Sequence, residues 1–150
     1  MTDRLNILMI SHHRRFRVYA RSHAMGKELV RRGHNVTLLV VADRRKVGIV
    51  ASDWDGVRVI ETPDLLWGRL RSGWDPWNLM NRRRFLGREK ASYDLIHCFE
   101  TRPVTIYPAL FYRKRHPVPL LTDWNDGWGR GGVIDEFRPK WYRSIFVPVE

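Results

Sequence analysis

Three short polar segments each follow a predicted apolar strand, and they contain the residues best suited to chemistry. They combine imidazoles, carboxylates, guanidinium groups and glycines, namely His12, His13, Arg14 and Arg15 after the first strand, Glu100 and Arg102 after the fourth, and Asp123, Asp126, Arg130, Gly131 and Gly132 after the fifth. Ligands of open parallel sheets bind beyond the carboxyl ends of the strands, so these segments are predicted to meet at one edge. Arginines and glycine-flanked backbone N–H groups suit phosphate, and carboxylates suit hydroxyl groups. The set indicates a sugar-like or phosphate-like ligand.

Each of these residues also has an interpretation that involves no ligand. His12 and His13 are adjacent and point to opposite sides of an extended segment, so at most one of them is expected to reach a ligand. Glu100 can instead cap a helix that begins near Thr101, or pair with a neighbouring arginine. Asp123 begins a glycine-containing loop, where carboxylates often serve turn formation alone. The residues by themselves leave both interpretations open.

Dinucleotide, ATP and metal sites are disfavoured by what the sequence lacks. The turn after the first strand reads Ser-His-His-Arg-Arg-Phe-Arg, without the Gly-x-Gly-x-x-Gly pattern of dinucleotide-binding turns, and the chain has no P-loop sequence. A metal set of His12, His13, Glu100 and Asp123 matches no ligand spacing, so we predict no metal site. The lone Cys98 excludes a disulfide framework and a cysteine-based zinc cluster. No cofactor is therefore predicted.

Alternating apolar and polar segments predict the elements that must position these residues. The predicted strands are short apolar runs, typical of buried parallel strands, at residues 5–10, 35–41, 57–60, 93–99 and 119–122. The predicted helices run from Val18 to Gly33, from Pro76 to about Lys90 and from Thr101 to about Lys114. A charged loop with an Asp-Gly turn is predicted over residues 42–56. This order of elements predicts an α/β fold with a Rossmann-like, doubly wound parallel sheet.

The composition fits one basic domain of a cytoplasmic protein. The chain has 150 residues, and 27 Lys and Arg against 16 Asp and Glu give a formal net charge of +11. No apolar run approaches the roughly 18 residues of a membrane span, and the first residues lack a signal-peptide pattern. Residues 141–150 form a partly apolar segment without a stop signal, so we expect the chain to continue into a longer protein.

The positive charge is concentrated in four runs. These are Arg14-Arg15-x-Arg17, Arg44-Arg45-Lys46, Arg82-Arg83-Arg84 and Arg113-Lys114-Arg115. Each run alone is most simply a solvated face. Together with Trp67, Trp74 and Trp77 they resemble a surface that meets anionic lipid, where each Lys or Arg contributes about 1 kcal/mol. The tryptophans can equally belong to the core. A peripheral position at the inner face of a membrane is the expectation that follows from the first interpretation.

Several ordered phrases resemble one enzyme family. Leu5 to Ser11 is an apolar opening strand, and Leu29 to Thr37 fits the phrase Leu-x-x-x-Gly-His-x-Val-Thr. Tyr93 to Cys98 reads Tyr-Asp-Leu-Ile-His-Cys, and the fifth strand leads into Asp123-x-x-Asp126. In this order the phrases resemble the N-terminal domain of GT-B glycosyltransferases of the family 4 type.

The resemblance implies a two-domain enzyme in which this half binds the acceptor and a C-terminal half binds the nucleotide-sugar donor. The paired-glutamate donor signature of the family belongs to that second half. The chain departs from the family in two places. His-His-Arg-Arg follows the first strand where many members have Gly-Gly, and Trp124 or Asn125 stands where members often have histidine.

Glycosyl transfer needs an acceptor hydroxyl in line with the anomeric carbon and stabilisation of the departing diphosphate. By their position in the loops, the catalytic candidates are Asp126, Glu100 and His13. The candidates for binding the acceptor or the donor phosphates are His12, Arg14, Arg15, Arg102, Asp123, Arg130, Gly131 and Gly132. The predicted partners are a nucleotide-sugar and a glycan or lipid acceptor, and the isolated 150 residues are expected to lack turnover.

A second function class also fits the charge. A non-catalytic basic α/β module would bind an anionic membrane or nucleic acid, although nucleic acid is disfavoured under the transferase interpretation. Such a binder loses affinity steeply with salt and does not respond to a nucleotide-sugar. Salt dependence and response to the donor therefore discriminate between the two classes.

Overall fold

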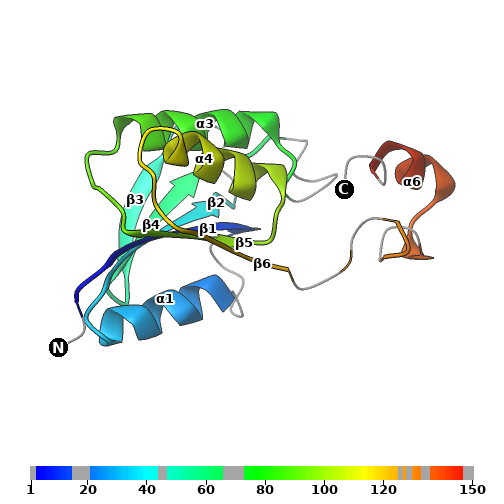
Figure 1. The fold of residues 1–150 in the computed structure, drawn as a ribbon. Helices are drawn as coiled ribbons and strands as arrows, with labels where there is room; N and C mark the ends of the chain where they lie inside the picture. Colours follow the sequence, from blue (N-terminus) through cyan, green and yellow to red (C-terminus); the bar gives the residue numbers. More distant parts are fainter. Residues whose placement is uncertain are drawn as a thin grey trace.

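A computed structural model describes residues 3–14, 21–43, 47–65, 73–124, 127, 130–132 and 136–146. A six-stranded sheet lies between helices that cover both of its faces (Figure 1). The strands are β1 (Asn6–Arg14), β2 (Asn35–Val41), β3 (Val50–Trp54), β4 (Val57–Thr62), β5 (Leu95–Phe99) and β6 (Leu120–Asp123). The helices are α1 (Arg21–Arg31), α3 (Pro76–Arg88), α4 (Pro103–Arg113) and α6 (Lys140–Phe146).

The strand order is β3-β4-β2-β1-β5-β6, and every neighbouring pair is parallel except β3 with β4. From β1 the chain first builds outward through β2 to β4. It then crosses the sheet and adds β5 and β6 on the other side of β1. The order of the parallel strands confirms the predicted Rossmann-like fold, and it puts the topological switch point, where such sheets bind ligands, between β1 and β5.

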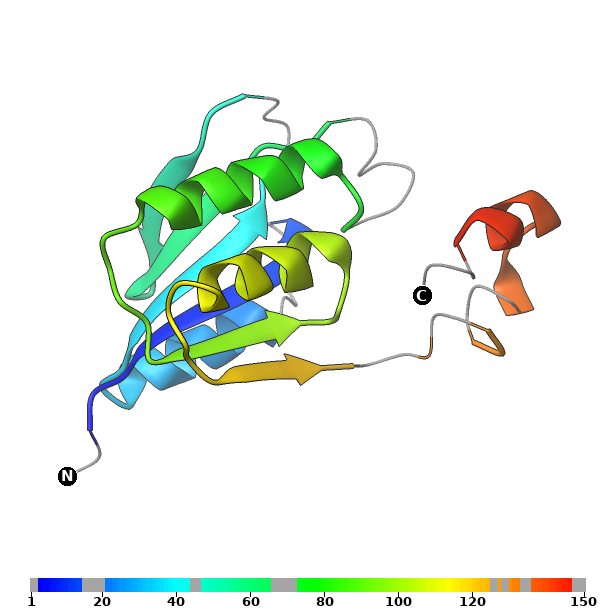
Figure 2. The same ribbon diagram turned by 45° about the horizontal axis from the view of Figure 1, so that its top comes forward.

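The core has two layers, one on each face of the sheet. Leu8 and Ile10 of β1 belong to the cluster that includes Leu86 of α3 and Ala109 of α4. Ile7 and Met9, which alternate with them, belong to the cluster on the other face, which Leu29 of α1 covers. Figure 2 shows α3 and α4 side by side across one face, with α1 behind the sheet.

Helix ends follow the signals in the sequence. The carboxylate of Asp75 accepts hydrogen bonds from the backbone N–H groups of Trp77 and Asn78, and Pro76 occupies the first turn of α3. After α1, Gly33 adopts a positive φ of 95°, the left-handed conformation that commonly ends a helix. The predicted β2 agrees with the structure at both ends.

The predicted charged loop at 42–56 is wrong in its second half, because residues 50–54 form strand β3. This strand pairs antiparallel with β4, and Asp55 and Gly56 connect the two with φ values of 51° and 79°. Two positive φ values in an Asp-Gly pair are characteristic of a tight hairpin turn that matches the twist of the strands. The Asp-Gly signal was therefore present in the sequence, but the half-buried edge strand before it lacks a continuous apolar run.

Thr101 does not open the helix that was predicted from it. Helix α4 begins at Pro103, and Arg102 occupies the N-cap without a capping hydrogen bond from its side chain. The N–H of Val104 in the first turn donates to the carbonyl oxygen of Gly73 at 3.1 Å instead, and the hydroxyl of Thr105 donates to the carbonyl oxygens of Glu100 and Arg102 at 2.7 Å each. Among the described helices, none has the length and apolar content that crossing a bilayer requires.

Candidate functional site

Strand β1 does not end at Ile10 as predicted but continues to Arg14. Ile10 pairs with Leu39 and Arg14 with Val41, so β1 has two more residues than β2 over this stretch and forms a bulge. The polar residues remain in the strand because both neighbouring strands supply backbone partners, and Ser11 still pairs with Phe99 of β5. The histidines thus lie at the carboxyl end of β1, beside the switch point.

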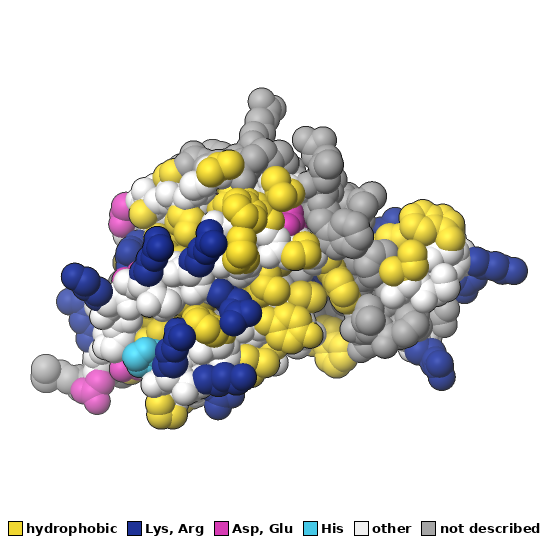
Figure 3. All heavy atoms as spheres, turned by 90° about the horizontal axis from the view of Figure 1, so that it is seen from above, with side chains coloured by type: hydrophobic (Ala, Val, Ile, Leu, Met, Phe, Trp, Pro, Cys, Tyr) yellow, Lys and Arg dark blue, Asp and Glu magenta, His cyan; other side chains and the backbone are white. Residues whose placement is uncertain are grey.

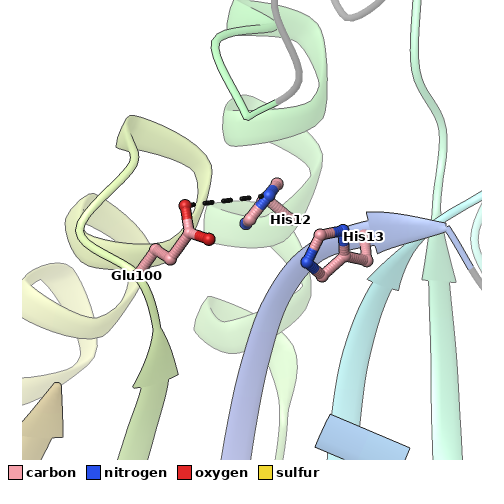
Figure 4. Close-up of side chains that lie close together, drawn as sticks. All are labelled: His12, His13 and Glu100. Atoms are coloured by element: carbon pink, nitrogen blue, oxygen red, sulfur yellow. Dashed lines mark ion pairs between the residues drawn. The ribbon is translucent and has the colours of Figure 1, made fainter. Parts of the chain in front are cut away.

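His12 lies across from Glu100, the first residue after β5 (Figure 4). The Nε2 atom of His12 is 3.9 Å from Oε2 of Glu100, and both side chains are buried. Burial, followed by the positive charges of His13 and Arg102, lowers the pKa of His12 to about 2. Because the imidazole is therefore neutral near pH 7, it faces the carboxylate as a polar group and not as a cation.

Glu100 is held in place through both its side chain and its backbone. Nε of Arg102 donates to its Oε2 atom at 2.8 Å. Its backbone adopts φ 67°, an uncommon conformation for glutamate, and its N–H donates to both Oδ1 and the carbonyl oxygen of Asp123. A strained backbone that the surroundings hold in place is a feature that clusters at binding sites.

The bulge brings His12 and His13 together instead of separating them. Their ring centroids are 4.0 Å apart and tilted by 41°, so the expectation that they point to opposite sides of the strand is wrong. Among the described residues, ligand atoms of His12, His13 and Glu100 lie within 4.8 Å of one another, and Asp123 is not part of this set. The positive charges of Arg102 and Arg82 help to lower the pKa of His12, and the same charges would repel a metal ion bound beside it. The prediction of no metal site remains a prediction.

Arg82 is fully buried, so the expectation that its basic run lies on the surface is wrong for this residue. Its guanidinium group donates to the carbonyl oxygens of Ser11 and Val104 at 2.8 Å each, and to Oγ1 of Thr62 at 3.1 Å. Burial lowers the pKa of Arg82 to about 9. Leu86 lies one helical turn later on the same buried face of α3, and this spacing is the one signal by which sequence reasoning could have found it.

Asp123, at the end of β6, connects this strand to α1 and β5. Its Oδ2 atom lies 2.7 Å from a guanidinium nitrogen of Arg21 and 3.3 Å from Nε2 of His97. The His97 ring stacks on Phe99 with centroids 4.3 Å apart. Burial lowers the pKa of His97, while the charge of Asp123 acts in the opposite direction. Sequence reasoning missed both Arg21 and His97, because each lies within a regular element and not in a loop.

The structure brings only some of the predicted site residues together. It gathers His12, His13, Glu100, Arg102 and Asp123 at the carboxyl ends of β1, β5 and β6. Arg130 and Gly131 are exposed and Gly132 is half-buried, and all three lie between β6 and α6 in the sequence. Figures 1 and 2 show α6 away from the sheet. Arg14 ends β1, with its side chain outside the described part, and Arg15 and Asp126 lie outside the described residues.

The thiol of Cys98 takes no part in this site. It is buried beneath α4, where its Sγ atom lies 3.5 Å from the carbonyl oxygen of Thr105. Burial raises the pKa of this thiol to about 12, so it stays protonated near pH 7.

Comparison with known protein families places most of the chain in one family. The family model described as a glycosyl transferase 4-like domain matches residues 18–148. The matched region contains Glu100, Arg102 and Asp123 but begins after His12 and His13. No curated protein matches the chain.

Proposed function

The chain belongs to the glycosyl transferase 4-like family, and on this basis we propose that it forms the acceptor-side half of a sugar-transferring enzyme. The co-substrate that we infer is a nucleotide-sugar, bound mainly by a second half outside these 150 residues. The acceptor is a hydroxyl group of a glycan or of a lipid-linked molecule. No cofactor beyond the nucleotide-sugar enters this proposal.

The observation that supports the proposal is the pairing of His12 with Glu100 at the switch point of the sheet. A neutral imidazole and a carboxylate together accept and donate hydrogen bonds as a sugar hydroxyl requires. Arg102 donates a hydrogen bond to Oε2 of Glu100. Within the described residues, no hydrogen bond is made to the second oxygen, Oε1. That oxygen can therefore accept a hydrogen bond from an acceptor hydroxyl.

Transfer forms a bond between the acceptor oxygen and the anomeric carbon and breaks the bond from that carbon to the diphosphate. We assign Glu100, His12 and the adjacent His13 to orienting the acceptor hydroxyl. Asp123 has both oxygens engaged within the protein, so we assign it to positioning Glu100. Phosphate binding by Arg14, Arg15 and Arg130, and a catalytic role for Asp126, remain proposals from their positions in the sequence.

The test compares Glu100→Gln with wild type in the full-length protein. The assay supplies hexoses labelled in the sugar and linked to different nucleoside diphosphates, and it measures label in glycan and lipid extracts. Glutamine keeps the shape of the side chain but loses the negative charge that pairs with Arg102. We therefore expect the rate of sugar transfer to fall by about 100-fold. The matched control, Glu28→Gln, changes an exposed carboxylate on α1 and should leave the rate unchanged.

Two results would contradict the proposal. One is a Glu100→Gln protein that transfers sugar at the wild-type rate. The other is a full-length protein that transfers no sugar from any donor and binds anionic surfaces with a steep dependence on salt. The second result would identify the chain as the non-catalytic basic module.

A further inference from the structure

A groove with a volume of about 550 Å³ runs along the outer face of α3 and the end of α4. It lies on the side of the sheet away from α1, and Figure 3 shows this side with dark-blue cationic side chains spread between yellow apolar ones. Its charged lining residues are all arginines. They are Arg83, Arg84, Arg88 and Arg115.

In the part of the chain that the structure describes, these four arginines differ from Arg32 and Arg58 in having no acidic partner. Arg32 pairs with Glu28 at 3.0 Å, and Arg58 pairs with Glu89 at 2.8 Å. Within the described residues, no carboxylate forms an ion pair with the groove arginines Arg83, Arg84, Arg88 and Arg115. The groove therefore presents uncompensated positive charge, which complements an anionic partner.

The same side of the domain exposes large apolar side chains. Met80 is exposed beside the arginines of α3, and Tyr107 and Leu110 are exposed one helical turn apart on α4. Exposed apolar groups between unpaired arginines match the layered chemistry of a bilayer surface, where phosphates lie above acyl chains. Tyrosine in particular favours this interface.

The groove is poorly suited to stacking nucleic-acid bases. Its aromatic lining residue is Phe111, and the guanidinium groups of Arg83 and Arg115 lie 4.7 and 4.3 Å from the centre of that ring. Proteins that bind single strands need aromatic faces on which bases stack. Here those faces are already occupied by cations, so the ring orders the arginines for contact with anionic groups instead.

We propose that this outer side of α3 and α4 docks on a bilayer that contains anionic lipids. Arg83, Arg84, Arg88 and Arg115 bind lipid phosphates, while Met80 and the exposed side chains of α4 enter the interfacial layer. The docked side lies across the sheet from α1, whereas His12 and Glu100 lie at the carboxyl ends of β1 and β5. The proposal does not rest on sugar transfer, because vesicle binding is measured without donor or acceptor.

The test measures cosedimentation of the purified chain with vesicles. One set contains phosphatidylcholine alone, and the other contains about one third phosphatidylglycerol. We expect binding to the second set only, and release when the salt concentration is raised from about 0.1 M to about 1 M. The double variant Arg83→Glu with Arg88→Glu should bind at least 25-fold more weakly, since each lost arginine weakens binding by about fivefold and the introduced glutamates add repulsion.

A matched control separates this surface from the overall charge. Arg31→Glu with Arg32→Glu makes the same change in net charge on the exposed face of α1, across the sheet from the groove. We expect this control to retain binding within about threefold of wild type. Met80→Ser should weaken binding without abolishing the preference for phosphatidylglycerol. Thermal unfolding of each variant checks that the fold is intact.

Three outcomes would overturn the proposal. The first is that the chain binds neither type of vesicle. The second is that the α1 control loses as much binding as the groove variant, which would indicate attraction by net charge alone. The third is that a polyglutamate peptide binds the wild-type chain, but not the groove variant, while anionic vesicles stay unbound. The last result would identify an acidic peptide as the occupant.

Discussion

The guanidinium group of Arg82 donates a hydrogen bond of 2.8 Å to the carbonyl oxygen of Ser11, linking α3 to the carboxyl end of β1. The same group reaches Thr62 at the end of β4 and Val104 at the start of α4. One buried side chain thus links three chain segments, namely the carboxyl ends of β1 and β4 and the start of α4. The position of His12, which directly follows Ser11, depends on this bridge.

Replacing Arg82 should therefore destabilise the whole domain. In Arg82→Met the buried carbonyl oxygens of Ser11 and Val104 lose their donor, and methionine fills most of the volume. We expect the free energy of unfolding to fall by about 3 kcal/mol, as measured by urea denaturation. The neighbouring Arg83→Met changes an exposed side chain and should cost less than about 0.5 kcal/mol. Equal losses in the two variants would contradict the bridging role.

The lowered pKa of His12 predicts a loss of stability in acid. In the unfolded chain a histidine binds a proton near pH 6.5, whereas burial lowers the pKa of His12 in the fold to about 2. The contribution is complete above pH 6.5 and is lost as the pH falls below it, by up to about 1.4 kcal/mol per pH unit. Urea denaturation between pH 7 and pH 5 measures this slope.

Substitution of His12 isolates its share of the pH dependence. His12→Gln keeps a neutral polar side chain, so its stability should fall less steeply between pH 7 and pH 5 than that of wild type. His116→Gln provides the control at an exposed histidine. Parallel curves for wild type and His12→Gln would show that another group carries the acid sensitivity.

Gly73 has no side chain, and the side chain of Arg102 packs against it in the space that a Cβ atom would fill. Its φ is +87°, and a Cβ atom added there would lie 2.8 Å from Cβ of Arg102. Gly73→Ala should strain the backbone and displace the arginine that holds Glu100, lowering the free energy of unfolding by about 3 kcal/mol. Gly48→Ala shares the positive φ of +81° but meets nothing within 4 Å, so it should cost only about 1 kcal/mol. A difference near zero between these variants would argue against the crowding.

The sheet could be predicted because its central strands are continuous apolar runs. Strand β2, for example, is buried along almost its whole length, and the predicted and observed ends agree. Strand β3 could not be found in the same way, since its alternate side chains face solvent at the edge of the sheet. The polar end of β1 was missed for a related reason. Its residues remain in the strand through partners that lie far away in the sequence, on β5 and α3.

The sequence predicted the site residues at the strand ends, but it did not predict the buried residue that holds them in place. The switch-point rule led from the sequence to His12, Glu100 and Asp123, because it depends only on where strands end. Arg82 could not be found by that rule, since it lies in the middle of α3 within a run that is otherwise exposed. Its role depends on three acceptors that only the folded chain brings together.

The hydrogen bonds between Asp123 and Glu100 also make the backbone at Glu100 dependent on the last strand of the sheet. Both acceptors of the Glu100 N–H group belong to Asp123, so the left-handed backbone at Glu100 has no partner until β6 has been made and added to the sheet. A nascent chain that ends after α4 can already pair β1, β2, β4 and β5. We therefore expect the backbone beside His12 to be the last part of the sheet to take shape as the chain leaves the ribosome.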